Sequence, residues 1–104
     1  KNVDDIRESP SLRLIEIIEE RGAKVDYYDP YVAVIPMTRE HASLAGRQSA
    51  SFDAANVANY DAVLIATDHD CVDYQFLVRT AKIVVDARNA CARNGALAEN
   101  VVKA

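Results

Sequence analysis

The chain has 104 residues, half of them hydrophobic, which is the composition of one globular domain and excludes a disordered protein. No apolar run approaches the roughly 18 residues that a membrane-spanning helix needs, and no signal-peptide pattern opens the chain. The net charge of −4 disfavours nucleic-acid binding, because the phosphate backbone attracts basic surfaces. We therefore expect a cytoplasmic protein whose partners include neither nucleic acid nor a membrane.

The cysteines do not predict a metal site. Cys71 and Cys91 are far apart and form no Cys-x-x-Cys pair, and only His41 and His69 could add imidazole ligands. A structural zinc site takes four ligands at close spacing, so we expect no metal. Two thiols fit a reducing compartment, although a single disulfide between them stays open.

The first predicted element is a helix that follows a polar loop at residues 1–8. Ser9 is a favourable N-cap and Pro10 suits the first helical position, while Arg21-Gly22 has the composition of a helix end. Between them the apolar residues form a broad face, suited to lie on a sheet: Leu12, Leu14, Ile15, Ile17 and Ile18.

Three segments predict strands. Residues 23–28 form the first, which Asp29-Pro30 ends, and residues 62–66 (Ala-Val-Leu-Ile-Ala) and 83–85 have the composition of strands buried on both faces. Residues 31–50 are expected to form a long irregular segment, called the excursion below. Short helices are expected at residues 52–59 and 72–80, and the Ala-rich tail from residue 90 is expected to be weakly helical. The alternation predicts a three-layer α/β fold, with a parallel sheet and helices on both faces.

Ligands of parallel sheets bind beyond the carboxyl ends of the strands. Polar stretches occur there after each predicted strand, at Asp29-Pro30, at residues 67–70 and at residues 86–89. With residues 1–8 at the same edge, a helix N-terminus together with Arg7 and Arg88 would hold an anionic ligand. No Gly-rich phosphate loop occurs, so the chain is not a self-contained dinucleotide-binding fold.

Several short motifs follow one another in a familiar order. They are the segment at residues 1–11 with its Arg-Glu-Ser-Pro, then Gly22-Ala23, Tyr28-Asp29-Pro30, Tyr60-Asp61-Ala62, Thr67-Asp68-His69 and Val85-Asp86-Ala87-Arg88. Over residues 1 to about 90 the chain resembles the Rossmann-like C-terminal, UDP-binding domain of the UDP-glucose/GDP-mannose dehydrogenase family. Residues 2–7 and 67–70 look most similar to bacterial UDP-N-acetylglucosamine 6-dehydrogenases, with UDP-glucose and UDP-N-acetylmannosamine dehydrogenases as alternatives.

The resemblance implies a larger enzyme in which NAD-binding and central dimerising domains precede this one. Such an enzyme, a homodimer, oxidises the sugar C6 alcohol twice to a carboxylate with reduction of two NAD, and so supplies polysaccharide precursors. Its catalytic residues lie upstream, so none is expected here and the 104 residues alone should be inactive. The resemblance further implies that Arg7 contacts NAD, and that Arg88 and Lys1 contact the UDP-sugar.

The resemblance also implies that residues 1–104 are a piece of that domain without its first strand. The first lysine of the family's Lys-Lys pair is missing as well, and Lys1 matches the second. A missing central strand would leave inner edges on residues 23–28 and 62–66. We expect these two strands to pair directly, or residues outside this sequence or a neighbouring molecule to fill the gap.

Each candidate residue has a plainer alternative. Arg7 can pair with neighbouring acids, Lys1 is a chain-end lysine, and Asp5 either caps the helix region or orients Arg7. Asp29 is expected to cap its turn rather than bind a ribose. His69 is expected as a solvated turn residue, although flanking aspartates favour its charged form. The rival function from another class is a non-catalytic α/β regulatory or scaffold module.

Overall fold

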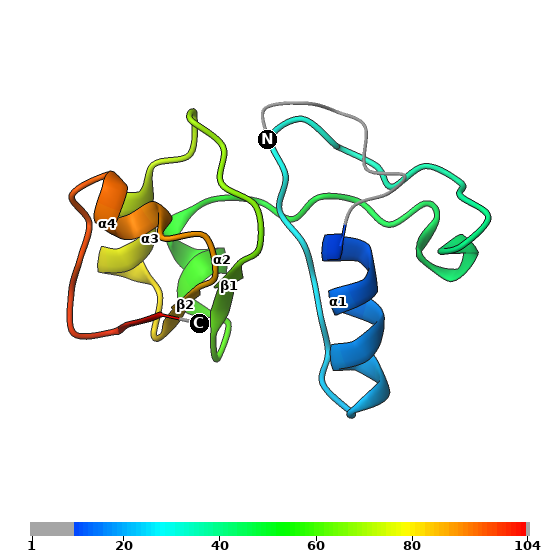
Figure 1. Cartoon of the computed structure of the whole chain (residues 1–104), viewed down its shortest axis with the longest axis horizontal. Coiled ribbons are helices and arrows are strands. Elements are labelled where there is room, and N and C mark those ends of the chain that lie inside the picture. Colours follow the sequence, from blue (N-terminus) through cyan, green and yellow to red (C-terminus); the bar gives the residue numbers. More distant parts are fainter. Residues whose placement is uncertain (1–9, 104) are drawn as a thin grey trace. The chain divides into compact units, whose positions relative to one another are not determined.

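The computed structural model describes residues 10–103, so Lys1, Asp5 and Arg7 lie outside the described residues. The chain divides into two compact units, one ending at residue 50 and one beginning at residue 51 (Figure 1). No helix in the described part is long and apolar enough to cross a membrane.

The first unit is built on the predicted helix. Helix α1 runs over Pro10–Glu20, and the turn after it contains Gly22, whose positive φ of 94° suits a residue without a side chain. Its buried Leu12 and Ile15 pack with Ile35 and with Leu44 of the short 3₁₀ helix η1 (Ala42–Leu44). The helix therefore buries its apolar face against the excursion that follows it in the sequence.

The excursion at residues 31–50 is more ordered than predicted. Ile35 and the 46–47 turn exchange two backbone hydrogen bonds of 2.9 Å, and Val34 forms an antiparallel bridge with Gln48. Charged pairs join this loop to α1: Arg47 donates to both carboxylate oxygens of Glu19, at 2.8 and 2.9 Å. The pairing with Arg47 lowers the pKa of Glu19.

The strand predicted at residues 23–28 is wrong. The backbone there is extended, and exposed residues alternate with half-buried ones such as Val25 and Tyr27, yet the segment belongs to no ladder. Its contacts are individual bonds: Ala50 N–H donates to the Tyr27 carbonyl at 2.7 Å, and the Tyr27 hydroxyl donates to the Val32 carbonyl at 2.9 Å. A strand-like pattern yields a strand only where a neighbouring strand pairs with it.

The second unit contains a parallel sheet. Strands β1 (Val63–Ile65), β2 (Val84–Asp86) and β3 (Val101–Lys103) lie in the order β1-β2-β3, all parallel. The first two coincide with the strands predicted at residues 62–66 and 83–85. The predicted α/β class with a parallel sheet is therefore confirmed, and it is consistent with a Rossmann-like domain.

Three short helices accompany the sheet. Helices α2 (Ala54–Ala58) and α3 (Tyr74–Thr80) begin at Asp53 and Asp73, whose carboxylates accept backbone N–H groups at 2.9 and 3.0 Å. Helix α4 (Ala90–Arg93) starts the Ala-rich tail. Strand β3 then follows where the sequence predicted a weakly helical tail, because a run of three residues carries no recognisable strand pattern.

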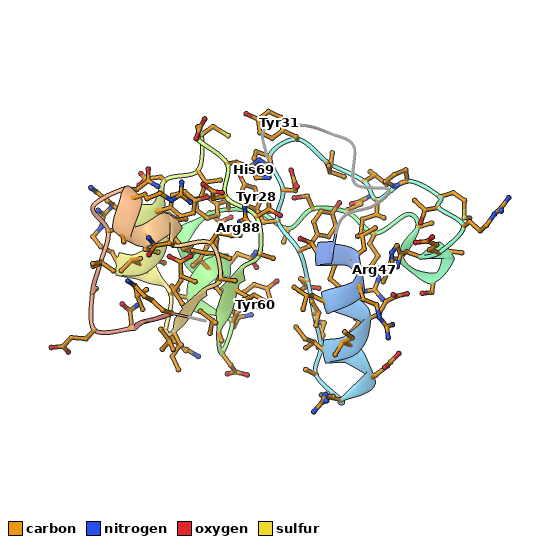
Figure 2. The ribbon with its side chains drawn as sticks, in the orientation of Figure 1. Tyr28, Tyr31, Arg47, Tyr60, His69 and Arg88 are labelled. Atoms are coloured by element: carbon orange, nitrogen blue, oxygen red, sulfur yellow. The ribbon has the colours of Figure 1, made fainter. Side chains whose placement is uncertain are left out.

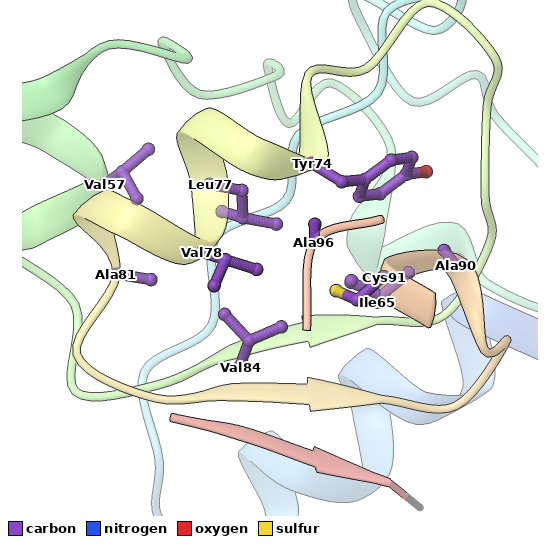
Figure 3. Close-up of a cluster of buried hydrophobic side chains, with 10 residues drawn as sticks. All are labelled: Val57, Ile65, Tyr74, Leu77, Val78, Ala81, Val84, Ala90, Cys91 and Ala96. Carbon is purple, nitrogen blue, oxygen red and sulfur yellow. The ribbon is translucent and has the colours of Figure 1, made fainter. Parts of the chain in front are cut away.

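The core of this unit lies between one face of the sheet and the helices (Figure 3). Val84 of the central strand, Ala90 and Cys91 have no exposed surface, and Ile65 and Leu77 are nearly as buried. Burying one such Val or Leu side chain stabilises a fold by about 1.5–3 kcal/mol relative to leaving it exposed. This packing fixes the strand ends that carry the polar loops.

Strand β1 is an edge strand. Within residues 10–103 it has a ladder partner on one side only, and Leu64 is exposed. The expectation that residues 62–66 would pair directly with residues 23–28 is therefore wrong for the described residues, and filling of this edge by residues outside this sequence or a neighbouring molecule stays a prediction.

Candidate ligand site at the ends of β1 and β2

Two polar loops meet at one edge of the sheet. β1 and β2 are adjacent and parallel, so the loop at residues 66–70 and the loop at residues 87–89 leave the same edge. The predicted juxtaposition is confirmed for these two loops. The Asp29-Pro30 turn belongs to the other unit, and Asp29 caps it as expected by accepting the N–H groups of Tyr31 and Val32 at 2.7 and 3.2 Å.

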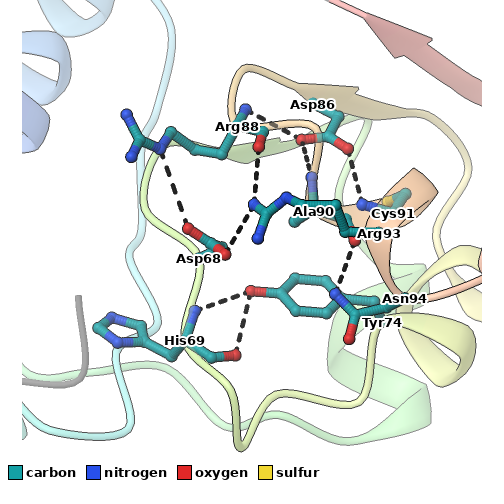
Figure 4. A network of polar contacts seen from close by, with 9 residues as sticks. All are labelled: Asp68, His69, Tyr74, Asp86, Arg88, Ala90, Cys91, Arg93 and Asn94. Carbon is teal, nitrogen blue, oxygen red and sulfur yellow. Dashed lines mark hydrogen bonds and ion pairs between the residues drawn. The ribbon is translucent and has the colours of Figure 1, made fainter.

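Asp86, the last residue of β2, organises the second loop. Its side chain is buried and accepts three backbone N–H groups, from Arg88 at 3.0 Å, Ala90 at 3.1 Å and Cys91 at 2.8 Å (Figure 4). Burial by itself raises the pKa of this carboxyl, but the three donors outweigh it and the pKa lies below its usual value. Asp86 is therefore an ionised structural acid that shapes the loop and begins α4.

Arg88 projects from the loop that Asp86 shapes. Its side chain is 56% exposed, and its Nε lies 3.9 Å from Oδ1 of Asp68, which is beyond hydrogen-bond distance. It borders an open depression of about 430 Å³, whose lining includes Asn89 and Lys103. Since the Asp86 carboxylate faces backbone donors, Arg88 and Lys103 give the depression a positive character that suits an anionic ligand.

Arg93, on α4, was not singled out from the sequence. Its Nη2 donates to Oδ2 of Asp68 at 2.7 Å and to the carbonyl of Arg88 at 2.8 Å, so one nitrogen joins the two loops (Figure 4). Asp68 lies 25 positions away in the sequence, and no local spacing signals this pair. Lys103 was not singled out either, because it lies at the site only as part of β3, which the sequence did not predict.

His69 differs from its expected setting. It is only 5% exposed, not a solvated turn residue, and it lies in the same unit as Arg88 (Figure 2). Its backbone N–H donates to the hydroxyl of Tyr74 at 2.9 Å, which joins the loop after β1 to the start of α3. Burial raises the pKa of Tyr74, so this hydroxyl stays protonated. The backbone contact makes His69 part of the loop's structure.

The two cysteines are both free thiols. Cys71 is exposed and Cys91 is buried in the core, so the disulfide left open from the sequence does not occur in the structure. Burial, together with the nearby Asp86 carboxylate, raises the pKa of Cys91 to about 11.

Comparison with known proteins identifies the domain type. The UDP binding domain of the UDP-glucose/GDP-mannose dehydrogenase family matches residues 1–93, which include both polar loops. The chain belongs to this family. The resemblance seen in the motifs is thereby confirmed.

Individual members of the family are about a third identical to the chain over the aligned residues. A UDP-glucose 6-dehydrogenase of Haloferax volcanii is 38% identical over 97 residues, covering 90% of this chain and 22% of its own length. A UDP-N-acetyl-D-mannosamine dehydrogenase of Pyrococcus horikoshii is 35% identical over 91 residues, covering 83% of this chain and 18% of its own length. The chain thus spans about a fifth of these relatives. No solved structure matches it significantly.

Proposed function

We propose that this chain is the UDP-sugar-binding part of an NAD-dependent nucleotide-sugar 6-dehydrogenase, and that Arg88 binds the substrate. In that reaction the C6 alcohol and one water become a carboxylate as two NAD⁺ accept two hydrides and three protons are released. The resemblance at residues 2–7 and 67–70 favours UDP-N-acetylglucosamine as the sugar. The names of the relatives make UDP-glucose and UDP-N-acetylmannosamine the alternatives.

The observation that carries this proposal is the placement of Arg88. Its backbone is fixed by a buried carboxylate at the end of a central parallel strand, while its side chain remains more than half exposed beside the depression. A planar guanidinium forms paired, charge-assisted hydrogen bonds with phosphate oxygens, and a nucleoside diphosphate offers several of them. A fixed backbone with an extended cationic side chain is therefore a suitable arrangement for the UDP moiety.

The remaining roles rest on the family resemblance. Arg7 would contact NAD and Lys1 the UDP-sugar, while the catalytic groups and most of the NAD site would come from the rest of a homodimeric enzyme that makes polysaccharide precursors. The three glycines of this chain are Gly22, Gly46 and Gly95, so none of them forms a Gly-rich phosphate loop. The 104 residues alone should therefore produce no NADH.

The test is an assay of the full-length protein with NAD and each of the three UDP-sugars, followed by NADH absorbance. The proposal expects two NADH per sugar with one of them, and UDP alone should inhibit competitively. If none is oxidised although UDP binds, the dehydrogenase proposal fails and a non-catalytic binding module is favoured. If UDP does not bind either, the assignment of the site to UDP fails as well.

A further inference from the structure

We propose that Arg93 is a positioning residue for substrate binding: it neutralises Asp68 and thereby keeps Arg88 available for the ligand. The inference rests on the proposed role of Arg88. It assigns to Arg93 no contact with the ligand itself.

The first observation is that two arginines approach one buried carboxylate unequally. The Asp68 side chain is only 6% exposed, so its charge must be compensated by nearby donors. Arg93 provides a hydrogen bond of 2.7 Å, whereas Arg88 lies 3.9 Å away through Nε. Figure 4 shows the guanidinium of Arg88 extending past Asp68, while that of Arg93 points at it. Of the two arginines, Arg93 is therefore the one that is hydrogen-bonded to Asp68.

The second observation is that both backbone groups of Arg88 are held. Its N–H donates to Oδ1 of Asp86 at 3.0 Å, and its carbonyl accepts from Nη2 of Arg93 at 2.8 Å. The peptide groups on either side of the Arg88 Cα are thus fixed from two directions. Only the side chain is left to reorient, and fixing the base of a flexible cation lowers the entropy that binding must remove.

Removal of Arg93 has a specific consequence in this geometry. A buried carboxylate that loses a charged hydrogen-bond donor is less well compensated, and Arg88 already lies beside it, at 3.9 Å. Arg88 would turn to Asp68 and be withdrawn from the ligand. Neutralising Asp68 as well would remove the competitor and release Arg88. Rescue by a second substitution is not expected if Arg93 binds the ligand directly.

The experiment measures UDP affinity by titration calorimetry in the full-length protein. Arg93→Ala should weaken UDP binding about tenfold, and Asp68→Asn should change it less. The double variant should recover part of the loss, because Asp68 no longer competes for Arg88 but the bond from Arg93 to the Arg88 carbonyl stays absent. Arg79→Ala, which removes an exposed arginine from α3, is the matched control and should bind as the wild type does. Thermal unfolding of each variant shows that it is folded.

Unchanged affinity in Arg93→Ala, or a double variant as weak as Arg93→Ala, would overturn the positioning role while leaving the proposed function intact. If Arg93→Ala does not fold, Arg93→Lys takes its place, because lysine keeps the charge that compensates Asp68 but not the planar fork. A smaller loss that Asp68→Asn again reverses supports the inference, and a loss that it does not reverse contradicts it. A wild type that does not bind UDP would overturn the proposed function and this inference together.

Discussion

The carboxylate of Asp86 accepts the backbone N–H of Cys91 at 2.8 Å, so a buried acid at the end of β2 also holds the first turn of α4. The strand, the loop and the helix after it are thereby one connected structure. The stability of the loop that presents Arg88 depends on this carboxylate being ionised.

Asp86→Asn should destabilise the protein by about 2 kcal/mol at neutral pH, the scale for hydrogen bonds to a charged group. The pKa of Asp86 is lowered in the folded protein, so its contribution is complete above the usual value near 3.8 and is lost as the pH falls through the lowered one. The Asn variant lacks this dependence. Urea unfolding should therefore show a difference between the two proteins that is constant above about pH 4 and shrinks below it. A difference independent of pH down to acid unfolding would contradict this role.

The two thiols should differ in reactivity. The thiolate is the reactive form, and Cys91 combines full burial with a pKa raised to about 11, whereas Cys71 is exposed. Iodoacetamide at mildly alkaline pH should alkylate Cys71 in the native protein and leave Cys91 intact, as read by peptide mass spectrometry. Denaturation should make both react, which serves as the control. Native labelling of Cys91 at the rate of Cys71 would show that the core of the second unit is packed differently.

Strand β3 is expected to depend on Asn100. Its side-chain amide donates to the carbonyls of Val78 at 2.8 Å and Ala81 at 3.0 Å, which joins the tail to the end of α3 just before β3 begins. Asn100→Ala should cost about 1–3 kcal/mol, because both bonds are lost in a half-buried setting. Asn59→Ala, on an exposed helix end, is the matched control. Equal stability of the two variants in urea would remove Asn100 from this role.

The sequence was sufficient for the elements whose signals are local. The α1 boundaries follow from a cap, a proline and a glycine, and β1 and β2 from continuous apolar runs. Residues 23–28 also have a strand-like pattern, in which apolar residues alternate with Lys24 and Asp26, but they form no ladder. Whether an extended segment becomes a strand depends on a partner elsewhere in the chain, and local sequence does not encode that partner.

In the site, too, the residues with local sequence signals were predictable and those positioned by distant contacts were not. Arg88 could be proposed because it follows a strand directly, at the edge where ligands of parallel sheets bind. Arg93 and Lys103 could not be proposed from the sequence. Arg93 contacts Asp68 only because the loops after β1 and β2 are adjacent, and Lys103 reaches the depression on a strand that was not predicted. His69 was predicted to be solvated because two aspartates flank it. The sequence does not show that the hydroxyl of Tyr74 accepts a hydrogen bond from the His69 backbone.

The central claim, that Arg88 binds the UDP moiety, is tested most directly by the dissociation constant of UDP for Arg88→Ala in the full-length protein. The account predicts a loss of about 1.5–3 kcal/mol, or about 10- to 150-fold, with Arg88→Lys recovering only part of it and Arg79→Ala unchanged. An Arg88→Ala protein that is folded and binds UDP as tightly as the wild type would contradict the claim.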